Sequence, residues 1–337
     1  MRNTERSRPA RWTARAARVE DVDLILDLVN ARSRKLFGED QATRESIAGF
    51  LTGPRQDLHR DVCIVLDEDA CLAGVAFAAN PGPPYADIAC AALAHPRYEQ
   101  AEGFVDQLQA WTLCRATELA SLAPSGARVV ASAAAVQQDR DGRAALNRAG
   151  FRVTRIDHHM RLDLDAPCPE PSWPTGATVR TADLATDVPA LASVYREAWR
   201  EHAGYVETSH EEVRASFVSD IESRMGPIDP SLWFLALDQG QVVGMSLGIP
   251  SLPANPAGGY VYQLGVRPAW RKRGIALALL RHTFAQFQQR GYRLVELDVD
   301  VENVTGALRL YERAGMRPVR SALSYELELR PRTCTEA

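Results

Sequence analysis

The stretch Val266-Arg267-Pro268-Ala269-Trp270-Arg271-Lys272-Arg273-Gly274-Ile275-Ala276 joins a segment that predicts a strand to one that predicts a helix. The run before it, Tyr260–Val266, is rich in β-branched and aromatic residues, which strands favour. After it, apolar residues recur at spacings typical of one helix face: Leu277, Leu280, Phe284 and Phe287. We therefore expect a strand, a basic turn that contains a glycine, and the N-terminus of a helix.

Such a junction predicts an anion site. Free main-chain amides and the positive end of the helix dipole both favour negative charge, and a cluster of cations adds to them. The small residues Gly274 and Ala276 leave room for a phosphate beside the backbone. The stretch contains neither G-x-x-x-x-G-K-[ST] nor G-x-G-x-x-G, so a P-loop and a Rossmann fingerprint are both excluded.

Two motifs in this part of the chain resemble those of the GCN5-related N-acetyltransferase (GNAT) family. Arg271-x-x-Gly274-x-Ala276, preceded by V-x-P, matches R-x-x-G-x-[GA]. The block Asn303–Met316 resembles N-x-x-A-x-x-x-Y-x-x-x-G-[FM], with its alanine one position late. The two motifs occur in order, joined by the expected helix and a strand, and together they form a specific signal.

The resemblance implies acetyl-CoA, or another acyl-CoA, as co-substrate, with no metal. It implies that the backbone of Leu264, Gly265 and Val266 pairs with the pantetheine arm. Asn303 is interpreted as an N-cap or a coenzyme contact. The pyrophosphate would be held, chiefly by main-chain amides, at six residues: Arg271, Lys272, Arg273, Gly274, Ile275 and Ala276.

The family motif places Tyr311 as the general acid that protonates the departing thiolate. The alternative is an aromatic residue buried on a helix face, because Ala307, Tyr311 and Ala314 share one stripe. Several family members carry a glutamate six residues before the valine of V-x-P, where this chain has Tyr260. The general base is therefore left open among several candidates: Glu296, Asp298, Glu207, His202 and His210.

The acceptor would bind under the segment 195–229, which the family places over its acceptor site. Carboxylates outnumber arginines there, which suits a cationic amine but also an ordinary exposed helix. Trp199, Tyr205 and Trp233 either line a pocket or pack in the core. We expect a primary amine of a small molecule or peptide as acceptor.

The chain of 337 residues suggests two domains. Prolines at 167, 169, 171 and 174 predict an extended linker over residues 165–176. The segments on either side echo each other, for example Arg148-Ala-Gly-Phe-Arg and Arg313-Ala-Gly-Met-Arg, 165 positions apart. We therefore expect an α/β protein of two tandem GNAT-like domains, each a mixed, mostly antiparallel twisted sheet flanked by helices. The expected divisions are a disordered basic tail at 1–13, domains at 14–164 and 177–330, and the linker between them.

The first half lacks the basic turn. Aligned through Pro96 and Pro268, Gly274 becomes Glu102 and Ala276 becomes Phe104. Aligned through the later echo, Tyr311 becomes Leu146. Carboxylates at a diphosphate site cost several kcal/mol. The first domain is therefore interpreted as a degenerate copy without a coenzyme site, which packs and shapes the substrate cleft.

Composition gives the remaining expectations. A net charge of −4 argues against a nucleic-acid partner, and no apolar run is long enough for a membrane helix. Cys63, Cys71 and Cys90 lie in apolar runs, as buried reduced thiols do, and the six cysteines form no C-x-x-C pair. We expect a cytoplasmic N-acyltransferase with no membrane partner. The alternatives are a longer acyl-CoA or an acyl-carrier protein as donor, or a non-catalytic protein that binds acyl-CoA.

Overall fold

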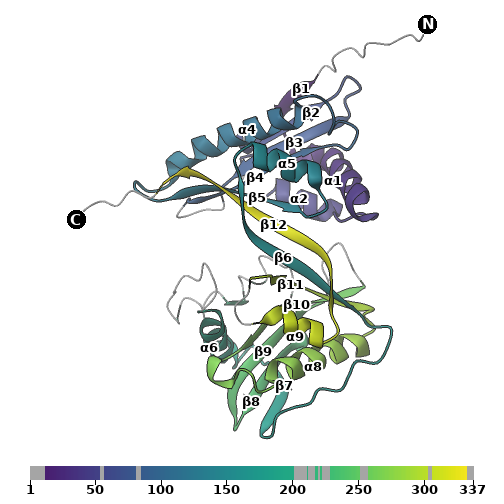
Figure 1. Ribbon diagram of the computed structural model, residues 1–337, viewed down its shortest axis with the longest axis vertical. Helices are drawn as coiled ribbons and strands as arrows, with labels where there is room; N and C mark the ends of the chain where they lie inside the picture. The colour runs from purple at the N-terminus through teal and green to yellow at the C-terminus, as the bar shows by residue number, and fades with distance from the viewer. Residues whose placement is uncertain are drawn as a thin grey trace. The chain divides into compact units, whose positions relative to one another are not determined.

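The computed structural model describes residues 12–53, 57–80, 85–200, 211, 217–218, 221, 228–250, 257–302 and 306–331. Contacts between Cα atoms divide the chain into two compact units (Figure 1). Unit 1 comprises residues 1–156 and 322–337, and unit 2 comprises residues 157–321. Each unit contains six neighbouring strands of one 12-stranded order, called below the sheet of that unit, with helices packed against them.

The sheet of unit 1 has the strand order β1-β2-β3-β4-β5-β12. Neighbouring strands are antiparallel except β4 and β5, which run parallel and pair only over Asp87–Ala89 and Val130–Ser132. The strands are β1 (Thr13–Ala16), β2 (Val62–Leu66), β3 (Leu72–Ala79), β4 (Asp87–Ala94), β5 (Val129–Val136) and β12 (Arg317–Arg330). The helices are η1 (Val19–Asp21), α1 (Val22–Phe37), α2 (Arg44–Leu51), α3 (Leu58–Asp61), α4 (Phe104–Leu119), η2 (Ala120–Leu122) and α5 (Arg140–Arg148).

The sheet of unit 2 repeats this order as β7-β8-β9-β10-β11-β6. Its parallel pair, β10 and β11, again joins over three residues only, Gly258–Tyr260 against Leu294–Glu296. The strands are β6 (Arg152–Asp163), β7 (Ala177–Thr181), β8 (Trp233–Asp238), β9 (Gln241–Ile249), β10 (Gly258–Val266) and β11 (Leu294–Asp300). The helices are α6 (Val188–Trp199), η3 (Pro230–Leu232), η4 (Pro268–Trp270), α8 (Ile275–Gln289) and α9 (Ala307–Arg313).

The last strand of each sheet comes from the other half of the sequence. Residues 157–163 of β6 pair with β11, and residues 322–330 of β12 pair with β5 (Figure 1). The compact units therefore do not coincide with the expected segments 14–164 and 177–330. Residues 165–176, the expected linker, contain no helix or strand. Of the expected tail, residues 1–11 lie outside the described residues, and β1 already begins at Thr13.

The predicted fold class is confirmed in both units. The helix expected after the basic turn is α8, and Leu280, Phe284 and Phe287 on its apolar face are fully buried. Added Cβ atoms at Gly248 and Gly259 would meet Phe287, so these glycines allow α8 to pack closely on β9 and β10. Burial of this face stabilises the packing of α8 on the sheet, because burying a large apolar side chain contributes about 1.5–3 kcal/mol to the free energy of unfolding.

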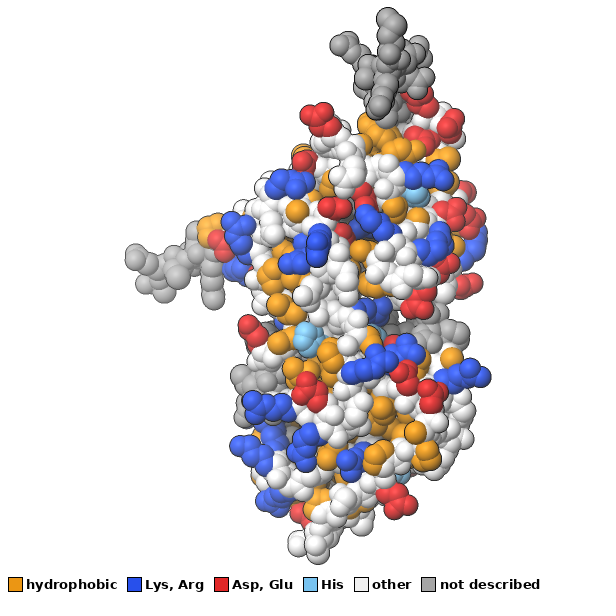
Figure 2. Space-filling view, turned by 45° about the vertical axis from the view of Figure 1, so that its right-hand side comes forward, with side chains coloured by type: hydrophobic (Ala, Val, Ile, Leu, Met, Phe, Trp, Pro, Cys, Tyr) orange, Lys and Arg blue, Asp and Glu red, His pale blue; other side chains and the backbone are white. Residues whose placement is uncertain are grey.

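The surface and the cysteines complete the description. On the face shown in Figure 2, hydrophobic side chains are scattered among polar and charged ones. No helix in the described part of the chain is long and apolar enough to cross a membrane. Cys63 and Cys90 are buried as expected, but the prediction for Cys71 is wrong. Cys71 is exposed because it closes the β2–β3 turn, where its amide donates to Asp67.

Candidate functional site

The basic turn adopts the conformation that an anion site requires. β10 ends at Val266, a short turn of helix follows at η4, and α8 begins after its N-cap, Gly274. Gly274 has φ of +91° and Lys272 has φ of +61°. A left-handed lysine costs about 1–2 kcal/mol, so the surrounding turn imposes this shape.

The N-terminus of α8 presents unused donors. The first amides of any helix have no partner within it, and in the described part of the chain the N-cap of α8 provides no side-chain hydrogen bond to them. A Cβ added at Gly274 would meet no atom within 4 Å, so there is open space beside the backbone at this N-cap. Ile275 is buried against Leu279 and Phe234 and fixes the helix end in place. Uncapped amides beside open space are what a diphosphate needs.

The three cations of the turn differ in their surroundings. The Arg271 guanidinium is turned inward, donating to the Ala198 carbonyl at 3.0 Å and to the Val266 carbonyl at 3.2 Å. It thus ties the end of α6 to the end of β10. Arg273 donates to the Ala269 carbonyl at 3.0 Å, and Lys272 is exposed. The side chain of Arg271 therefore supports the turn, and Lys272 and Arg273 supply its exposed charge.

An open strand edge lies next to this turn. β10 loses its parallel partner after Tyr260, and the described residues beyond that point pair only with β9. Leu264, Gly265 and Val266 pair with Ser246, Met245 and Gly244 on the β9 side. Their opposite edge faces the opening between β10 and β11, where an extended ligand can add as a further strand.

Tyr311 is buried in the core of unit 2, with 9% of its surface exposed. Among the described residues, its hydroxyl has no hydrogen-bond partner. Burial raises the pKa of Tyr311 to about 12, so the phenol keeps its proton at neutral pH. The side chain is therefore a core residue whose hydroxyl is protonated at neutral pH.

A network of ionisable side chains lies on the face of the sheet opposite α8. Asp298 Oδ1 lies 2.8 Å from Nδ1 of His159, and the Tyr260 hydroxyl donates to Asp298 Oδ2 at 2.7 Å. Nε2 of His159 lies 3.2 Å from Glu296 Oε1. Sequence reasoning proposed Glu296 and Asp298 but missed His159, because the exchanged strand β6 brings it across from the other half of the sequence.

Hydrogen bonds move these pKa values against the effect of burial. Burial lowers the pKa of His159, yet the bonds to Asp298 and Glu296 raise it above its ordinary value. The His159 bonds likewise hold the pKa values of Glu296 and Asp298 below their usual range, although burial opposes this. The network therefore places an imidazole whose pKa is raised between two carboxylates whose pKa values are lowered.

The remaining residues expected near the acceptor divide into two groups. Trp199 stacks on Tyr195 with ring centroids 4.9 Å apart, and a Cβ at Gly265 would lie 2.6 Å from Trp199. Trp233 is fully buried and packs in the core. Outside the described residues lie the other expected contacts: Asn303, His202, Tyr205, Glu207 and His210.

The corresponding turn of unit 1 differs from the alignment made through the prolines. Gly103, with φ of +69°, is the N-cap of α4 and matches Gly274, so the expected match with Glu102 is wrong by one residue. The turn of unit 1 is one residue longer after its proline. Phe104 is buried like Ile275, and Val105 occupies the position of Ala276.

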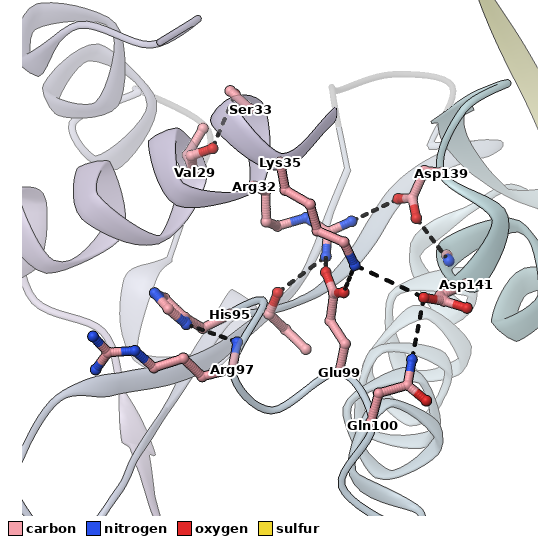
Figure 3. Close-up of polar contacts among 12 residues, drawn as sticks. Val29, Arg32, Ser33, Lys35, His95, Arg97, Glu99, Gln100, Asp139 and Asp141 are labelled. Carbon is pink, nitrogen blue, oxygen red and sulfur yellow. Dashed lines mark hydrogen bonds and ion pairs between the residues drawn. The ribbon is translucent and has the colours of Figure 1, made fainter. Parts of the chain in front are cut away.

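Carboxylates and their own cations surround the turn of unit 1 (Figure 3). Arg32 of α1 bonds Glu99 at 2.9 Å and Asp139 at 2.6 Å, and Lys35 also pairs with Glu99. A cavity of about 220 Å³ lies beside them. Pockets for drug-sized ligands are about 300–1,000 Å³, so this one is small for a coenzyme. Three carboxylates line it: Glu99, Asp106 and Asp141.

Comparison with known proteins agrees with the fold and the turn. A model of the acetyltransferase (GNAT) family matches residues 191–316. The crystal structure of a GCN5-related N-acetyltransferase from Sphaerobacter thermophilus is 31% identical, with a TM-score of 0.80, over 96% of this chain and 97% of that one. The chain belongs to the GCN5-related N-acetyltransferase family.

Within the family, the chain is of the tandem type and is similar to mycothiol acetyltransferases. The protein of that name from Thermobispora bispora is 34% identical over 51% of this chain and 58% of its own length. The chain thus matches somewhat more than half of this curated relative. A tandem GNAT protein from the clavulanic acid biosynthesis pathway shares the fold, with a TM-score of 0.69 at 18% identity over 95% of this chain and 99% of that one.

Proposed function

We propose that unit 2 catalyses transfer of an acyl group, acetyl by default, from coenzyme A to a primary amine of a small molecule or peptide. The observation that carries this proposal is the meeting of two unused binding surfaces. The uncapped N-terminus of α8 and the open edge of β10 adjoin the same turn, and Arg271 holds that turn in place. A diphosphate on a flexible, amide-containing arm fits both surfaces together.

The residues of the turn have separate roles in this proposal. Main-chain amides from Arg271 to Ala276 hold the diphosphate, with Lys272 and Arg273 as exposed counter-charges, and the backbone of Leu264 to Val266 pairs with the arm. The expected capping role of Asn303 is wrong, because the N-cap of α9 is Gly306, so Asn303 is kept only as a coenzyme contact. In direct transfer the amine nitrogen bonds to the carbonyl carbon while the carbon–sulfur bond breaks, and Tyr311 donates a proton to the departing sulfur.

Unit 1 would not bind coenzyme. Glu99 of its turn, Asp106 of α4 and Asp141 of α5 line the cavity there, and Glu99 also pairs with Arg32. A diphosphate placed there would meet like charge, which costs several kcal/mol. Leu146 occupies the position of Tyr311, so a proton donor is also missing there.

Calorimetry on the full chain tests the proposal. We expect acetyl-CoA to bind with a stoichiometry of about one per chain, because only one turn accepts a diphosphate. Release of free thiol from acetyl-CoA is then followed with glucosamine, lysine, ethanolamine and putrescine as acceptors. Binding without any amine-dependent thiol release would favour a non-catalytic acyl-CoA-binding protein, and no binding would refute the proposal.

A further inference from the structure

The two faces of β10 carry different side chains. Gly259 and Val266 lie toward α8, as the contact of an added Cβ at Gly259 with Phe287 and the packing of Val266 show. Tyr260 lies on the other face, which α6 also covers, because a Cβ at Gly265 would meet Trp199 of α6. The irregular pairing between Val261 and Gln263 shifts the alternation by one residue, so that Val266 lies toward α8 and Gly265 toward α6.

Asp298 lies at the point where the two parallel strands separate. The last pair between β10 and β11 is Tyr260 with Glu296, and Asp298 is the next residue of β11 on the same face. Its register partner on β6 is His159, so His159 also faces this side. The opening that receives the extended arm is thus bordered by a carboxylate on the face opposite α8.

The members of the network differ in their access to a ligand. The side chain of Asp298 is 50% exposed, whereas those of Glu296 and His159 are 12% and 6% exposed. Tyr260 is buried, and its hydroxyl donates a hydrogen bond to Asp298 Oδ2. Asp298 is therefore the network member best placed to touch a molecule entering the opening.

From this geometry we propose that Asp298 accepts the proton of the attacking amine, with His159 and Tyr260 as positioning residues. The inference rests on the proposed function and names a residue for its unassigned step. Tyr260 holds one carboxylate oxygen and His159 holds the other, so the carboxylate has a fixed orientation at the mouth of the opening. A group that carries the proton must lie within hydrogen-bond reach of the nitrogen, which an exposed and oriented carboxylate satisfies.

The step balances in protons and charge. The neutral amine forms the carbon–nitrogen bond and loses one proton to Asp298, while the sulfur leaves with its electron pair and takes the proton of Tyr311. His159 stabilises the carboxylate before transfer, and the coupled imidazole–carboxylate pair takes up the proton as a unit. Asp298 then returns its proton to solvent, and Tyr311 regains one.

Other charged groups face His159 and set the conditions for the test. Glu296 of β11 contacts Nε2, and Arg320 of β12 lies 3.5 Å from the same atom. Arg161 of β6 lies near Glu296, its partner across the strands. The two carboxylates around His159, Glu296 and Asp298, balance the charge of the two arginines, Arg320 and Arg161. The protonation of His159 therefore depends on its hydrogen bonds to the two carboxylates.

The test measures pH profiles of kcat/KM for the full chain with whichever panel amine it acetylates. Asp298→Asn should lower kcat by about 100-fold, the size expected for loss of a proton acceptor. Asp298→Glu should recover part of this loss, because it restores a carboxylate. His159→Asn should shift the acidic limb of the pH profile to a different pH. A purely structural change would lower kcat/KM at every pH and leave the limb at the same pH. Asp300→Asn, two residues further along β11, is the matched control and should behave as the unaltered chain.

Acetyl-CoA affinity and melting temperature, measured on each variant, separate the outcomes. Unchanged affinity with lost turnover in Asp298→Asn supports the inference. Turnover equal to that of the unaltered chain in a chemistry-limited assay overturns it while leaving the proposed function standing. Equal loss in Asp298→Asn and Asp298→Glu with an unshifted His159→Asn profile also overturns it. Failure of the unaltered chain to acetylate any panel amine counts against the proposed function itself.

Discussion

Gly103 and Gly274 occupy the same position in the two units, each the left-handed N-cap of the helix that follows the open parallel strand. The backbone at this position is therefore retained in both copies, while the side chains around it have diverged. Around Gly274 lie exposed cations, and around Gly103 lie carboxylates that form ion pairs with α1. The two turns share this N-cap conformation, but they differ in length by one residue and in the charge around the N-cap.

Gly274→Glu should weaken acetyl-CoA binding by at least about 100-fold, because a carboxylate placed at the diphosphate costs several kcal/mol. Titration calorimetry measures this. Gly240→Glu is the matched control, since Gly240 also has a positive φ, +84°, and equally open space around it, but lies in the β8–β9 turn. Equal affinity in the two variants would place the coenzyme elsewhere.

Tyr311→Phe should lower kcat by about 100-fold while leaving acetyl-CoA affinity nearly intact. The phenol, whose pKa is raised to about 12, stays protonated across ordinary assay conditions, so the loss should not depend on pH there. Tyr292→Phe provides the control, because Tyr292 packs edge-on against Phe287 in the same unit. Undiminished turnover in a chemistry-limited assay would remove Tyr311 as the acid.

Arg32→Ala should lower the free energy of unfolding by about 3 kcal/mol, since it leaves Glu99 and Asp139 as largely buried charges without their main partner. Arg34→Ala, on the same helix, removes an ion pair with Asp40 in which both side chains are about half exposed, and should cost about 0–1 kcal/mol. Urea denaturation compares the two. Coenzyme affinity should stay unchanged in both, and similar costs would show that the network contributes no more than a surface pair.

The cost of His159→Asn should be larger at about pH 5.5 than at about pH 8.5. The folded-state pKa of His159 is raised, so its stabilisation is complete below the ordinary histidine pKa and is lost as pH rises through the folded value. The corresponding replacement of His282 is a control in which the pH dependence of stability has the opposite sign. Burial lowers the pKa of His282, so this histidine disfavours folding as pH falls. Urea denaturation at both pH values measures the two differences. The same sign for both histidines would contradict the assigned shifts.

The local elements were predictable because their signals are local. The strand, basic turn and apolar face of α8 follow from residues that are neighbours in sequence. The one-residue insertion in the turn of unit 1 was missed, because proline marks the start of a turn but not its length. His159 was missed for a different reason, since its contacts with Asp298 span 139 positions and depend on strand exchange.

The exchanged strands tie the completion of each sheet to the far end of the chain. During synthesis, the N-terminal unit must wait for residues 322–330 before its final β-strand can join, so it is finished only when almost the whole polypeptide has emerged. Conversely, a C-terminal fragment that begins at the proline-rich segment would lack residues 157–163. The edge of β11 that pairs with these residues would then be unpaired and exposed. The sheet of the C-terminal unit therefore depends on a strand encoded before the proline-rich segment.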